Sequence, residues 1–514
     1  MTINPILFKS GNNNDYLYLP NQNKILYVHP LVAFLMEKSG EEGKNLELWV
    51  SGLKNKITLP EIGAFSPQEV RYYYKKFVKL ERTFLQREKE EDLQRQHHCL
   101  SARLDASSVE QAIANLRQIT FEVTDDCNLK CKYCGYGEFY NDYDERRKQK
   151  MDFTTARTLL EFLIAKWNSP LNRSHQMPVF VSFYGGEPLL NFTFINQVVT
   201  FINEQPIKNN KIFFSMTTNG LLLDKHADFL AGHDFHLLIS LDGDEFGNGY
   251  RVFHNGQPAF GRILKNIRAI QSNNPDYFKR RVNFNAVLHK KNSTTAILDF
   301  FNRNFQKIPA ISSLNTIGIS MESEKEFFDT YKNFSEDLTS DPNFDALEKK
   351  LFINSPTLRG LSSFLMDHSG HYYNDYNDFI KGPEQPPHYP SGTCIPFSKK
   401  MYVTVNGKIL PCERIGHQFA LGSVTSSGVE LNCKAVAETY NSYFDQLEKQ
   451  CLKCYKRETC GHCLFYLDYR EGKIKCDKFF SREKFSKYLA RNVSRLENDP
   501  ALYNRLKEDV VVDA

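Results

Sequence analysis

The stretch TDDCNLKCKYCGY, residues 124–136, begins at the end of the apolar run ITFEVT (119–124), which is typical of a buried strand. It places Cys127, Cys131 and Cys134 in the spacing C-x3-C-x2-C. A structural zinc site takes four ligands, so three thiols alone are one short of such a site. Lysine and tyrosine stand between the thiols, which argues against three core cysteines. The loop therefore indicates another kind of metal chemistry.

Three thiolates can hold a four-iron cluster in which one iron stays open for a bidentate ligand. The amino and carboxylate groups of S-adenosylmethionine can chelate such an iron, so that an electron from the cluster can cleave the sulfonium. Cleavage yields methionine and a 5′-deoxyadenosyl radical, which is chemistry of the cofactor that the protein must shield. The cysteine loop thus predicts a radical enzyme.

Six short β-rich runs alternate with helical periodicities between about residues 117 and 320. The runs are ITFEVT, VFVSFYG, IFFSMTT, FHLLISL, RVNFNAVL and LNTIGIS, and the helical stretches include TTARTLLEFLIAKW and FGRILKNIRAI. This alternation predicts an α/β fold with a parallel sheet that curls into a partial or full barrel. In such barrels the chemistry lies at the carboxyl ends of the strands.

Glycine-rich and polar motifs follow three further runs: FYGGEP (183–188), TTNG (217–220) and SLDG (240–243). Four motifs in order, each after its own strand, resemble the radical S-adenosylmethionine superfamily. The resemblance implies a partial (β/α)6 barrel in which Tyr133 contacts adenine, the backbone at Gly185, Gly186 and Glu187 receives the amino group, Thr218, Asn219, Ser240 and Asp242 contact the ribose and methionyl parts, and Arg251 pairs with the methionyl carboxylate. Taken alone, SLDG also fits a loop cap and Arg251 a surface ion pair.

The other cysteines gather near the C-terminus. Of twelve in the chain, eight lie between residues 394 and 476, and Cys99 stands apart behind His97 and His98, which we expect to be solvated. A disulfide framework belongs to small secreted chains, and MTINPILFKSGNNNDY shows no secretory signal. CLKCYKRETCGHC (451–463) taken alone fits a four-thiol zinc site. Beside the loop at 127–134, an iron–sulfur role is favoured.

Seven of these cysteines resemble the SPASM extension of the same superfamily, which binds two auxiliary four-iron clusters. The resemblance implies an outer cluster on Cys451, Cys454, Cys460 and Cys476 and an inner cluster on Cys394, Cys412 and Cys463. The two residues between Cys460 and Cys463 depart from the usual three. The fourth ligand of the inner cluster is left open between His388, Cys433 and none, and Cys433 also fits an unligated core thiol.

Glu413 directly follows Cys412. In sulfatase-maturing relatives an aspartate at this position is proposed to take a proton from the substrate, so the resemblance implies that Glu413 is a base. Pairing with Arg414 is the equal alternative.

The order of these patterns predicts five segments. Residues 1–110 form a small winged-helix-like domain, 111–320 the radical domain, 321–390 an acidic connection, 391–480 the SPASM domain and 481–514 a helical tail. In the first segment YLYLP, KILYVHP, NLELWV and KITLP read as strands, and a long helix begins after Ser66 as N-cap. The acidic stretch 370–378 either covers the active site or is a solvated loop.

Composition limits the partners. Lys and Arg number 65 against 61 Asp and Glu, a net charge of +4, which argues against a nucleic-acid binder. The longest apolar stretches are too short to cross a bilayer. We expect a cytoplasmic protein with no membrane or nucleic-acid partner.

Radical enzymes with this extension mostly modify peptides, and many carry a small leader-binding domain to which the leader adds as a strand. The resemblance therefore implies a maturase that takes hydrogen from a precursor peptide with a leader and forms a thioether or carbon–carbon crosslink. It further implies S-adenosylmethionine, three [4Fe–4S] clusters and a small redox protein such as flavodoxin or ferredoxin. The alternatives are a sulfatase-type maturase that forms formylglycine and a non-catalytic metal-bearing peptide-binding regulator. A purely structural role for residues 1–110 is also open.

Overall fold

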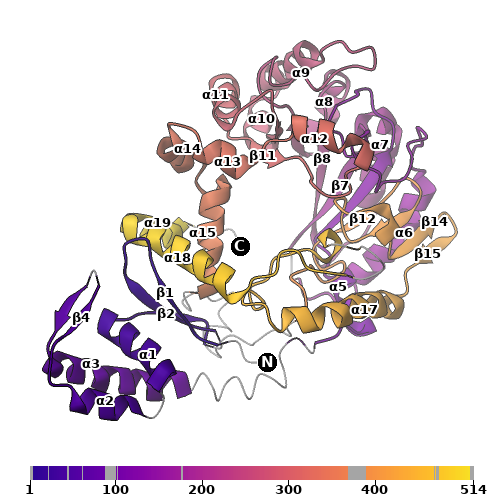
Figure 1. Ribbon diagram of the computed structural model, residues 1–514. Helices are drawn as coiled ribbons and strands as arrows, with labels where there is room; N and C mark the ends of the chain where they lie inside the picture. Colours follow the sequence, from indigo (N-terminus) through magenta and orange to yellow (C-terminus); the bar gives the residue numbers. More distant parts are fainter. Residues whose placement is uncertain are drawn as a thin grey trace. The chain divides into compact units, whose positions relative to one another are not determined.

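The computed structural model describes residues 4–20, 22–42, 45–60, 62–86, 100, 102–174, 177–368, 389–467, 469 and 474–509. The chain divides into two compact units (Figure 1). Unit 1 joins Met1–Arg103, Leu358–Gly392 and Ser442–Ala514, and unit 2 joins Leu104–Thr357 and Thr393–Asn441. The predictions for His97, His98, Cys99, His388 and the stretch 370–378 lie outside the described residues. The five predicted segment boundaries stay predictions.

Unit 2 is built on a ten-stranded sheet of order β11-β10-β9-β8-β7-β6-β12-β13-β14-β15. Six strands pair in parallel in chain order: β6 (Gln118–Thr124), β7 (Pro178–Gly185), β8 (Lys211–Thr218), β9 (His236–Ser240), β10 (Val282–Leu288) and β11 (Ala310–Ser313). At the other edge β12 (Met401–Val403) pairs in parallel with β6, and β13 (Lys408–Leu410), β14 (Gly422–Thr425) and β15 (Gly428–Glu430) follow in antiparallel pairs. The predicted α/β fold with a largely parallel sheet is confirmed.

The predicted sixth strand was misplaced. LNTIGIS (314–320) is not a strand, because β11 ends at Ser313, directly before it. Leu314 is buried instead in a cluster with Tyr133 and Phe139, and Ile319 packs against that cluster. Gly318 has a φ of +70°, a left-handed conformation that ends any extended run. The apolar residues of this stretch therefore cover the cysteine loop.

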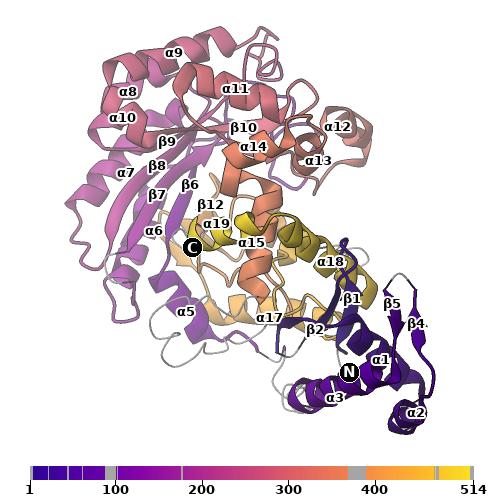
Figure 2. The same cartoon turned by 90° about the vertical axis from the view of Figure 1, so that its left-hand side faces the viewer.

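The helices of unit 2 lie before, between and after the parallel strands. They are α5 (Ala106–Ala114), α6 (Phe153–Trp167), α7 (Phe192–Glu204), α8 (Leu223–Gly232), α9 (Phe260–Asn273), α10 (Pro275–Arg281) and α11 (Thr294–Phe305), followed by α12 (Glu324–Thr330), α13 (Phe334–Thr339) and α14 (Phe344–Leu351). Figure 2 shows α7, α8 and α10 lying along one face of the strands. Two helices belong to both units, α15 (Pro356–His368) and α17 (Cys433–Cys451).

The two faces of the parallel sheet differ in chemistry. Phe121 and Phe183 are buried against Phe194 of α7, at ring distances of 6.0 and 6.5 Å. On the other face the register pairs Thr120 with Ser182, Ser182 with Ser215 and Ser215 with His236. Since a packed barrel interior is normally apolar, this row of polar residues indicates that the inner face meets a polar ligand or water.

Unit 1 begins with a small sheet of order β1-β2-β3 and a helical cluster. The elements are β1 (Ile6–Lys9), β2 (Asp15–Leu19), β3 (Lys24–Tyr27), α1 (Pro30–Glu42), α2 (Leu46–Gly52), the hairpin β4 (Ile57–Leu59) and β5 (Gly63–Phe65), and α3 (Pro67–Leu80). The predicted N-cap is confirmed: Ser66 Oγ accepts from the Glu69 amide at 3.3 Å, while the Glu69 carboxylate accepts from the Ser66 amide at 2.7 Å. NLELWV, predicted as a strand, forms α2.

The last helices, α18 (Arg482–Asn498) and α19 (Pro500–Asp509), also belong to unit 1. Helix α18 packs on the first sheet, where Glu497 accepts from the Tyr16 hydroxyl at 2.6 Å and from Asn14 Nδ2 at 2.9 Å. These hydrogen bonds connect the N-terminal and the C-terminal segments of unit 1. Among the helices of the described ranges, none is both long enough and apolar enough to cross a membrane.

Candidate active site

The cysteine loop follows β6 and forms part of the wall of a cavity of about 230 Å³ in unit 2. Cys127, Cys131 and Cys134 all line this cavity. Burial, with a smaller contribution from the neighbouring thiols, raises the pKa of Cys127 to about 11 and that of Cys131 to about 12. Thiolates gathered in this way are unfavourable unless a cation stands between them. The donor set therefore fits an iron–sulfur cluster, whose irons would supply that positive charge.

Two glycines join the end of β7 to the cysteine loop. The Gly186 amide donates to the Thr124 carbonyl at 2.8 Å, and the Glu187 amide donates to the Asp126 carbonyl at 2.9 Å. A Cβ atom on Gly186 would lie 1.9 Å from the Asp126 oxygen, and one on Gly185, whose φ is +126°, would lie 2.3 Å from the Thr124 oxygen. Both glycines also line the cavity. Because they have no side chain, the backbone here can come close both to the neighbouring chain segment and to a ligand.

Glu187 is not among the described residues that line the cavity, although Gly185 and Gly186 directly before it are. Its carboxylate is fully buried and accepts from Thr218 Oγ1 and the Asn219 amide, each at 2.8 Å, and from the Leu189 amide at 3.2 Å. Burial raises the pKa of Glu187 to about 7, although these three donors oppose the shift. The geometry makes Glu187 a clamp between the ends of β7 and β8.

Asn219 connects the end of β8 to the first cysteine. Its Nδ2 donates to Asn128 Oδ1 at 2.7 Å and lies 3.7 Å from Cys127 Sγ. Thr218, Asn219 and Ser240 line the cavity, as the strand-end rule predicts. Four strand ends thus surround one space.

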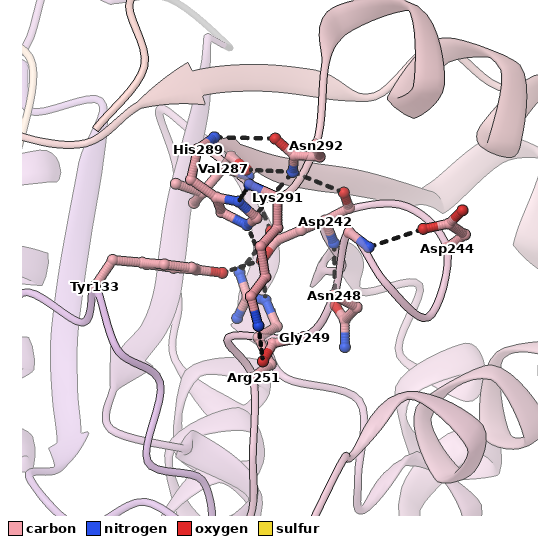
Figure 3. A network of polar contacts seen from close by, with 11 residues as sticks. Tyr133, Asp242, Asp244, Asn248, Gly249, Arg251, Val287, His289, Lys291 and Asn292 are labelled. Atoms are coloured by element: carbon pink, nitrogen blue, oxygen red, sulfur yellow. Dashed lines mark hydrogen bonds and ion pairs between the residues drawn. The ribbon is translucent and has the colours of Figure 1, made fainter. Parts of the chain in front are cut away.

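A buried network contributes Tyr133, Arg251 and Val287 to the lining of this cavity (Figure 3). Asp242 is fully buried and forms a bidentate pair with Arg251, with Nε to Oδ2 at 3.0 Å and Nη2 to Oδ1 at 3.1 Å. The Tyr133 hydroxyl and the Val287 amide also donate to this carboxylate. Arg251 is 7% exposed, which excludes the surface ion pair considered from the sequence. Arg251 lines the cavity, and Asp242 holds its guanidinium in place.

Sequence reasoning missed two residues of this network. His289 Nε2 lies 3.6 Å from Asp242 Oδ2, and its ring packs 5.5 Å from that of Tyr133. Asn292 Nδ2 donates to the Asp242 carbonyl at 3.0 Å. Both residues follow β10, in the stretch HKKN, so the strand-end rule applied to the fifth strand would have found them.

Glu413 lines two cavities of unit 2. It lines the cavity described above and a second one of about 300 Å³ on the polar inner face, lined also by Ser182, Ser215 and His236. Lys400 Nζ donates to both carboxylate oxygens of Glu413 at 2.9 Å. The sequence suggested Arg414 as the alternative partner, and Lys400 is the partner that the structure shows. A carboxylate at this place can accept a proton from a ligand in either cavity.

The C-terminal cysteines fall into both units. Within unit 1 Cys451, Cys454, Cys460 and Cys476 line one pocket of about 30 Å³. Burial, with smaller contributions from the other three thiols, raises the pKa of Cys451 to about 12. This convergence of four thiols fits a cluster ligand set. In the part of the chain that the structure describes, no group of three or more His, Cys, Asp or Glu residues is arranged to hold a single metal ion.

The remaining cysteines are placed separately. Cys394 and Cys412 belong to unit 2, whereas Cys463 belongs to unit 1, at the start of the short turn Leu464–Tyr466. The ligand set of the inner cluster stays a prediction. Burial raises the pKa of Cys433, and the charges of Glu110 and Lys166, which pair with each other, act on it in opposite directions.

Comparison with known proteins assigns the parallel sheet of unit 2 and its helices to a family. Residues 121–302, from β6 into α11, match the model of the Radical SAM superfamily. This chain contains a radical SAM domain. The predicted resemblance is thereby confirmed, and the domain covers the cysteine loop and all three further motifs.

Curated relatives of the radical SAM domain include enzymes. The uncharacterized protein MJ0907 of Methanocaldococcus jannaschii is 32% identical over 32% of this chain and 51% of its own length. The radical SAM cyclopropyl synthase TigE of Paramaledivibacter caminithermalis is 23% identical over 68% of this chain and 67% of its own. A cysteine-type anaerobic sulfatase-maturating enzyme of Clostridium novyi is 29% identical over 39% and 53%. The chain thus spans about half the length of the first and third of these relatives.

A solved structure shares the fold. Native anSMEcpe with bound AdoMet is 18% identical, with a TM-score of 0.50 over 76% of this chain and 99% of that one. The fold is therefore that of radical SAM proteins, and the chain is related to proteins named as maturases and as a cyclopropyl synthase.

Proposed function

We propose that this chain is a radical SAM peptide maturase. The observation that carries the proposal is that three thiols and the ends of four parallel strands line one cavity. When bound, S-adenosylmethionine on a four-iron cluster would supply a 5′-deoxyadenosyl radical, and auxiliary clusters would supply an electron acceptor. A crosslink then requires the substrate to lose one hydrogen atom, one electron and one proton.

The residues that would hold the cofactor are those around this cavity. Cys127, Cys131 and Cys134 would hold the cluster, and the backbone at Gly185 and Gly186 would receive the amino group. Tyr133, Thr218, Asn219, Ser240 and Arg251 would contact the rest of the molecule, while Glu187 and Asp242 would hold these contacts in position. Since the cavity walls come from separate strand ends, the cofactor itself would complete the link between them.

Glu413 is the proposed proton acceptor, and Lys400 fixes its orientation. Glu413→Gln keeps the size of the side chain but removes its basicity. We expect deoxyadenosine release to continue while peptide modification falls by about 10² or more, because general bases contribute on this order. The measurement is the ratio of modified peptide to deoxyadenosine in each variant.

Glu438→Gln is the matched control for that prediction. Glu438 lies on α17 with its side chain 66% exposed, near Lys434. Its ratio should equal that of the wild type. Equal ratios in all three proteins would contradict the role of Glu413.

We further propose a C-terminal SPASM domain with two auxiliary clusters. The convergence of Cys451, Cys454, Cys460 and Cys476 supports the outer one, and Cys394, Cys412 and Cys463 are the proposed ligands of the inner one. Replacing Cys451 and Cys454 by alanine should reduce iron from about twelve to about eight per chain, with an equal loss of labile sulfide. Cleavage of S-adenosylmethionine should persist, because the first cluster is untouched.

Cys433→Ala controls for the loss of a thiol as such. Because the charges that act on the pKa of Cys433 are those of Glu110 and Lys166 and not those of other thiols, we expect its variant to retain about twelve irons. Iron analysis of anaerobically reconstituted protein measures both variants. Full iron in the Cys451/Cys454 variant would contradict the outer cluster.

Residues 1–110 are proposed to bind the leader of the precursor peptide as a winged-helix-like domain. Strand β3 pairs with β2 alone among the described strands, so its other edge can accept an added strand. Tyr27 at the end of β3 is 63% exposed, and the next-but-one residue, His29, stacks on Tyr73 of α3 at 3.8 Å. These aromatic groups would give an added strand side-chain contacts.

A peptide partner is also consistent with the fold. The protein anSMEcpe, which shares the radical SAM fold at a TM-score of 0.50, has been solved with AdoMet and the Cp18Cys peptide. A small redox protein such as flavodoxin or ferredoxin is the proposed electron donor.

The proposal is tested by co-expressing the enzyme with a short peptide encoded beside its gene. Mass spectrometry should find a peptide lighter by two hydrogen atoms, with the change mapped to a crosslink. Oxidation of a serine or cysteine to formylglycine would assign a sulfatase-type maturase instead. An unmodified peptide in cells that produce fully loaded enzyme would contradict the proposal.

A further inference from the structure

A positively charged side chain lies against one of the three sulfurs. Arg146 Nη2 donates to Cys134 Sγ at 3.5 Å. The guanidinium carbon lies 4.4 Å from the centre of the Tyr136 ring, a distance typical of a cation–π contact. Arg146 Nε is buried and has no hydrogen-bond partner within the described ranges. Apart from its contact with sulfur, this arginine is therefore incompletely satisfied.

The segment that carries Arg146 is held on both sides. Before it, the Asp144 carboxylate accepts from Lys408 Nζ at 2.7 Å, and the Asp144 amide donates to His417 Nδ1 at 3.1 Å. After it, the Arg147 amide donates to Asp125 Oδ2 at 2.8 Å. Because these contacts fix the backbone, the position of the guanidinium at Cys134 is set by the fold.

The ring beneath Arg146 is fixed as well. Tyr136 lines the cavity, and its hydroxyl lies 2.8 Å from that of Tyr402, which is fully buried. Glu122 lies near this pair and is 1% exposed. Burial raises the pKa of Glu122, while the Arg146 charge opposes that shift. Arg146 thus has two possible partners: the cysteine sulfur and the charge of Glu122.

We infer that Arg146 is a positioning residue that raises the reduction potential of the iron–sulfur cluster on Cys127, Cys131 and Cys134. Reduction adds one electron, and hence one negative charge, to the cluster. A hydrogen bond to a ligating sulfur and a nearby cation both stabilise the more negative state. The inference rests on the proposed cluster and adds a residue that lies outside the four motifs.

The test compares reduction midpoints of the reconstituted full-length protein. Dithionite titrations are followed by electron paramagnetic resonance, and the relevant signal is the one that changes on adding S-adenosylmethionine. In Arg146→Gln the ratio of reduced to oxidised cluster should fall about tenfold at the wild-type midpoint, which is ~59 mV for one electron. Arg147→Gln is the matched control, because the Arg147 side chain is 69% exposed and its midpoint should not change.

An unchanged midpoint in Arg146→Gln at full iron and sulfide content would overturn the role of Arg146 but not the proposed cluster. A pure counter-charge role toward Glu122 gives that result together with a lower melting temperature. No peptide is present, so the outcome is independent of peptide modification. A wild-type protein without the cofactor-sensitive signal would overturn both the cluster and the role of Arg146.

If Arg146→Gln binds no iron, a second measurement tests the contact between Arg146 and Cys134. Wild-type protein and Arg146→Lys, which retains the charge, are labelled with ¹⁵N-arginine and studied as reduced clusters by pulsed electron paramagnetic resonance. A nitrogen coupling that is present in the wild type and lost in Arg146→Lys supports the contact. A coupling that is absent from the wild type, or unchanged in the variant, overturns it.

Discussion

Joint replacement of Cys127, Cys131 and Cys134 by alanine is expected to reduce deoxyadenosine release to the level of a buffer control. All three thiols line the same cavity, and the charges of Cys127 and Cys134 help to raise the pKa of Cys131. Without them the proposed cluster has no ligands, so no electron can reach the sulfonium. Iron should fall from about twelve to about eight per chain, because the auxiliary cysteines remain.

The measurement is deoxyadenosine by liquid chromatography and mass spectrometry, with dithionite as reductant. The Cys433→Ala variant serves again as the control and should release deoxyadenosine at the wild-type rate. Release that survives in the triple variant would overturn the assignment of these cysteines as ligands of the active cluster.

Asp242→Ala is expected to cause the largest loss of stability among single substitutions near the cavity. The carboxylate is fully buried, pairs with two nitrogens of Arg251 and accepts from Tyr133 and the Val287 amide. Removing one partner of a buried ion pair leaves the other charge uncompensated, at a cost of about 3–5 kcal/mol. Urea unfolding of the apoprotein measures this cost.

Asp244→Ala is the matched control, since Asp244 lies in the same loop but is exposed. It loses one contact, the Gly247 amide at 2.8 Å, and should cost about 1 kcal/mol or less. A second control is the double variant Asp242→Leu with Arg251→Met, which should be more stable than Asp242→Ala because no buried charge is left alone. Equal unfolding free energies for Asp242→Ala and Asp244→Ala would contradict the buried network.

The same pair predicts a pH dependence. Burial is the largest single influence and would raise the pKa of Asp242, but the charges and hydrogen bonds of Arg251 and His289 together outweigh it and hold the pKa at about 2. A carboxyl group with a lowered folded-state pKa stabilises the fold above its unfolded pKa of about 3.9. This contribution is lost as the pH falls from about 4 toward 2. The stability difference between wild type and Asp242→Asn should therefore shrink over that interval.

The sequence predicted which residues lie around the cavity better than it predicted the contacts that these residues make. Cys127, Gly186, Asn219 and Ser240 lie around one cavity because parallel strands bring their carboxyl ends to the same edge. The same rule was not applied to β10, so His289 was missed. Gly186 was expected to admit the cofactor, yet its nearest neighbour is the Asp126 carbonyl, which no local pattern reveals.

Contacts between distant parts of the chain could not be predicted. Lys400 directly precedes β12 and Glu413 follows β13, and the antiparallel pairing of these two strands brings the side chains together. Tyr136 and Tyr402 meet through the pairing of β12 with β6. These contacts depend on strand order, which a single sequence does not specify.

Short apolar runs misled the assignment of elements. NLELWV alternates like a strand but forms α2, in which Leu46 and Val50 are buried four residues apart. That spacing also satisfies a helix, so the period alone could not decide. LNTIGIS has the composition of a strand but covers the cysteine loop, because β11 has already ended.

The most direct test adds S-adenosylmethionine to anaerobically reconstituted, dithionite-reduced protein and measures 5′-deoxyadenosine and methionine. We predict equal amounts of both, from protein that holds about twelve irons and matching labile sulfide per chain. Protein that contains zinc without labile sulfide and releases neither product would contradict the assignment as a radical enzyme.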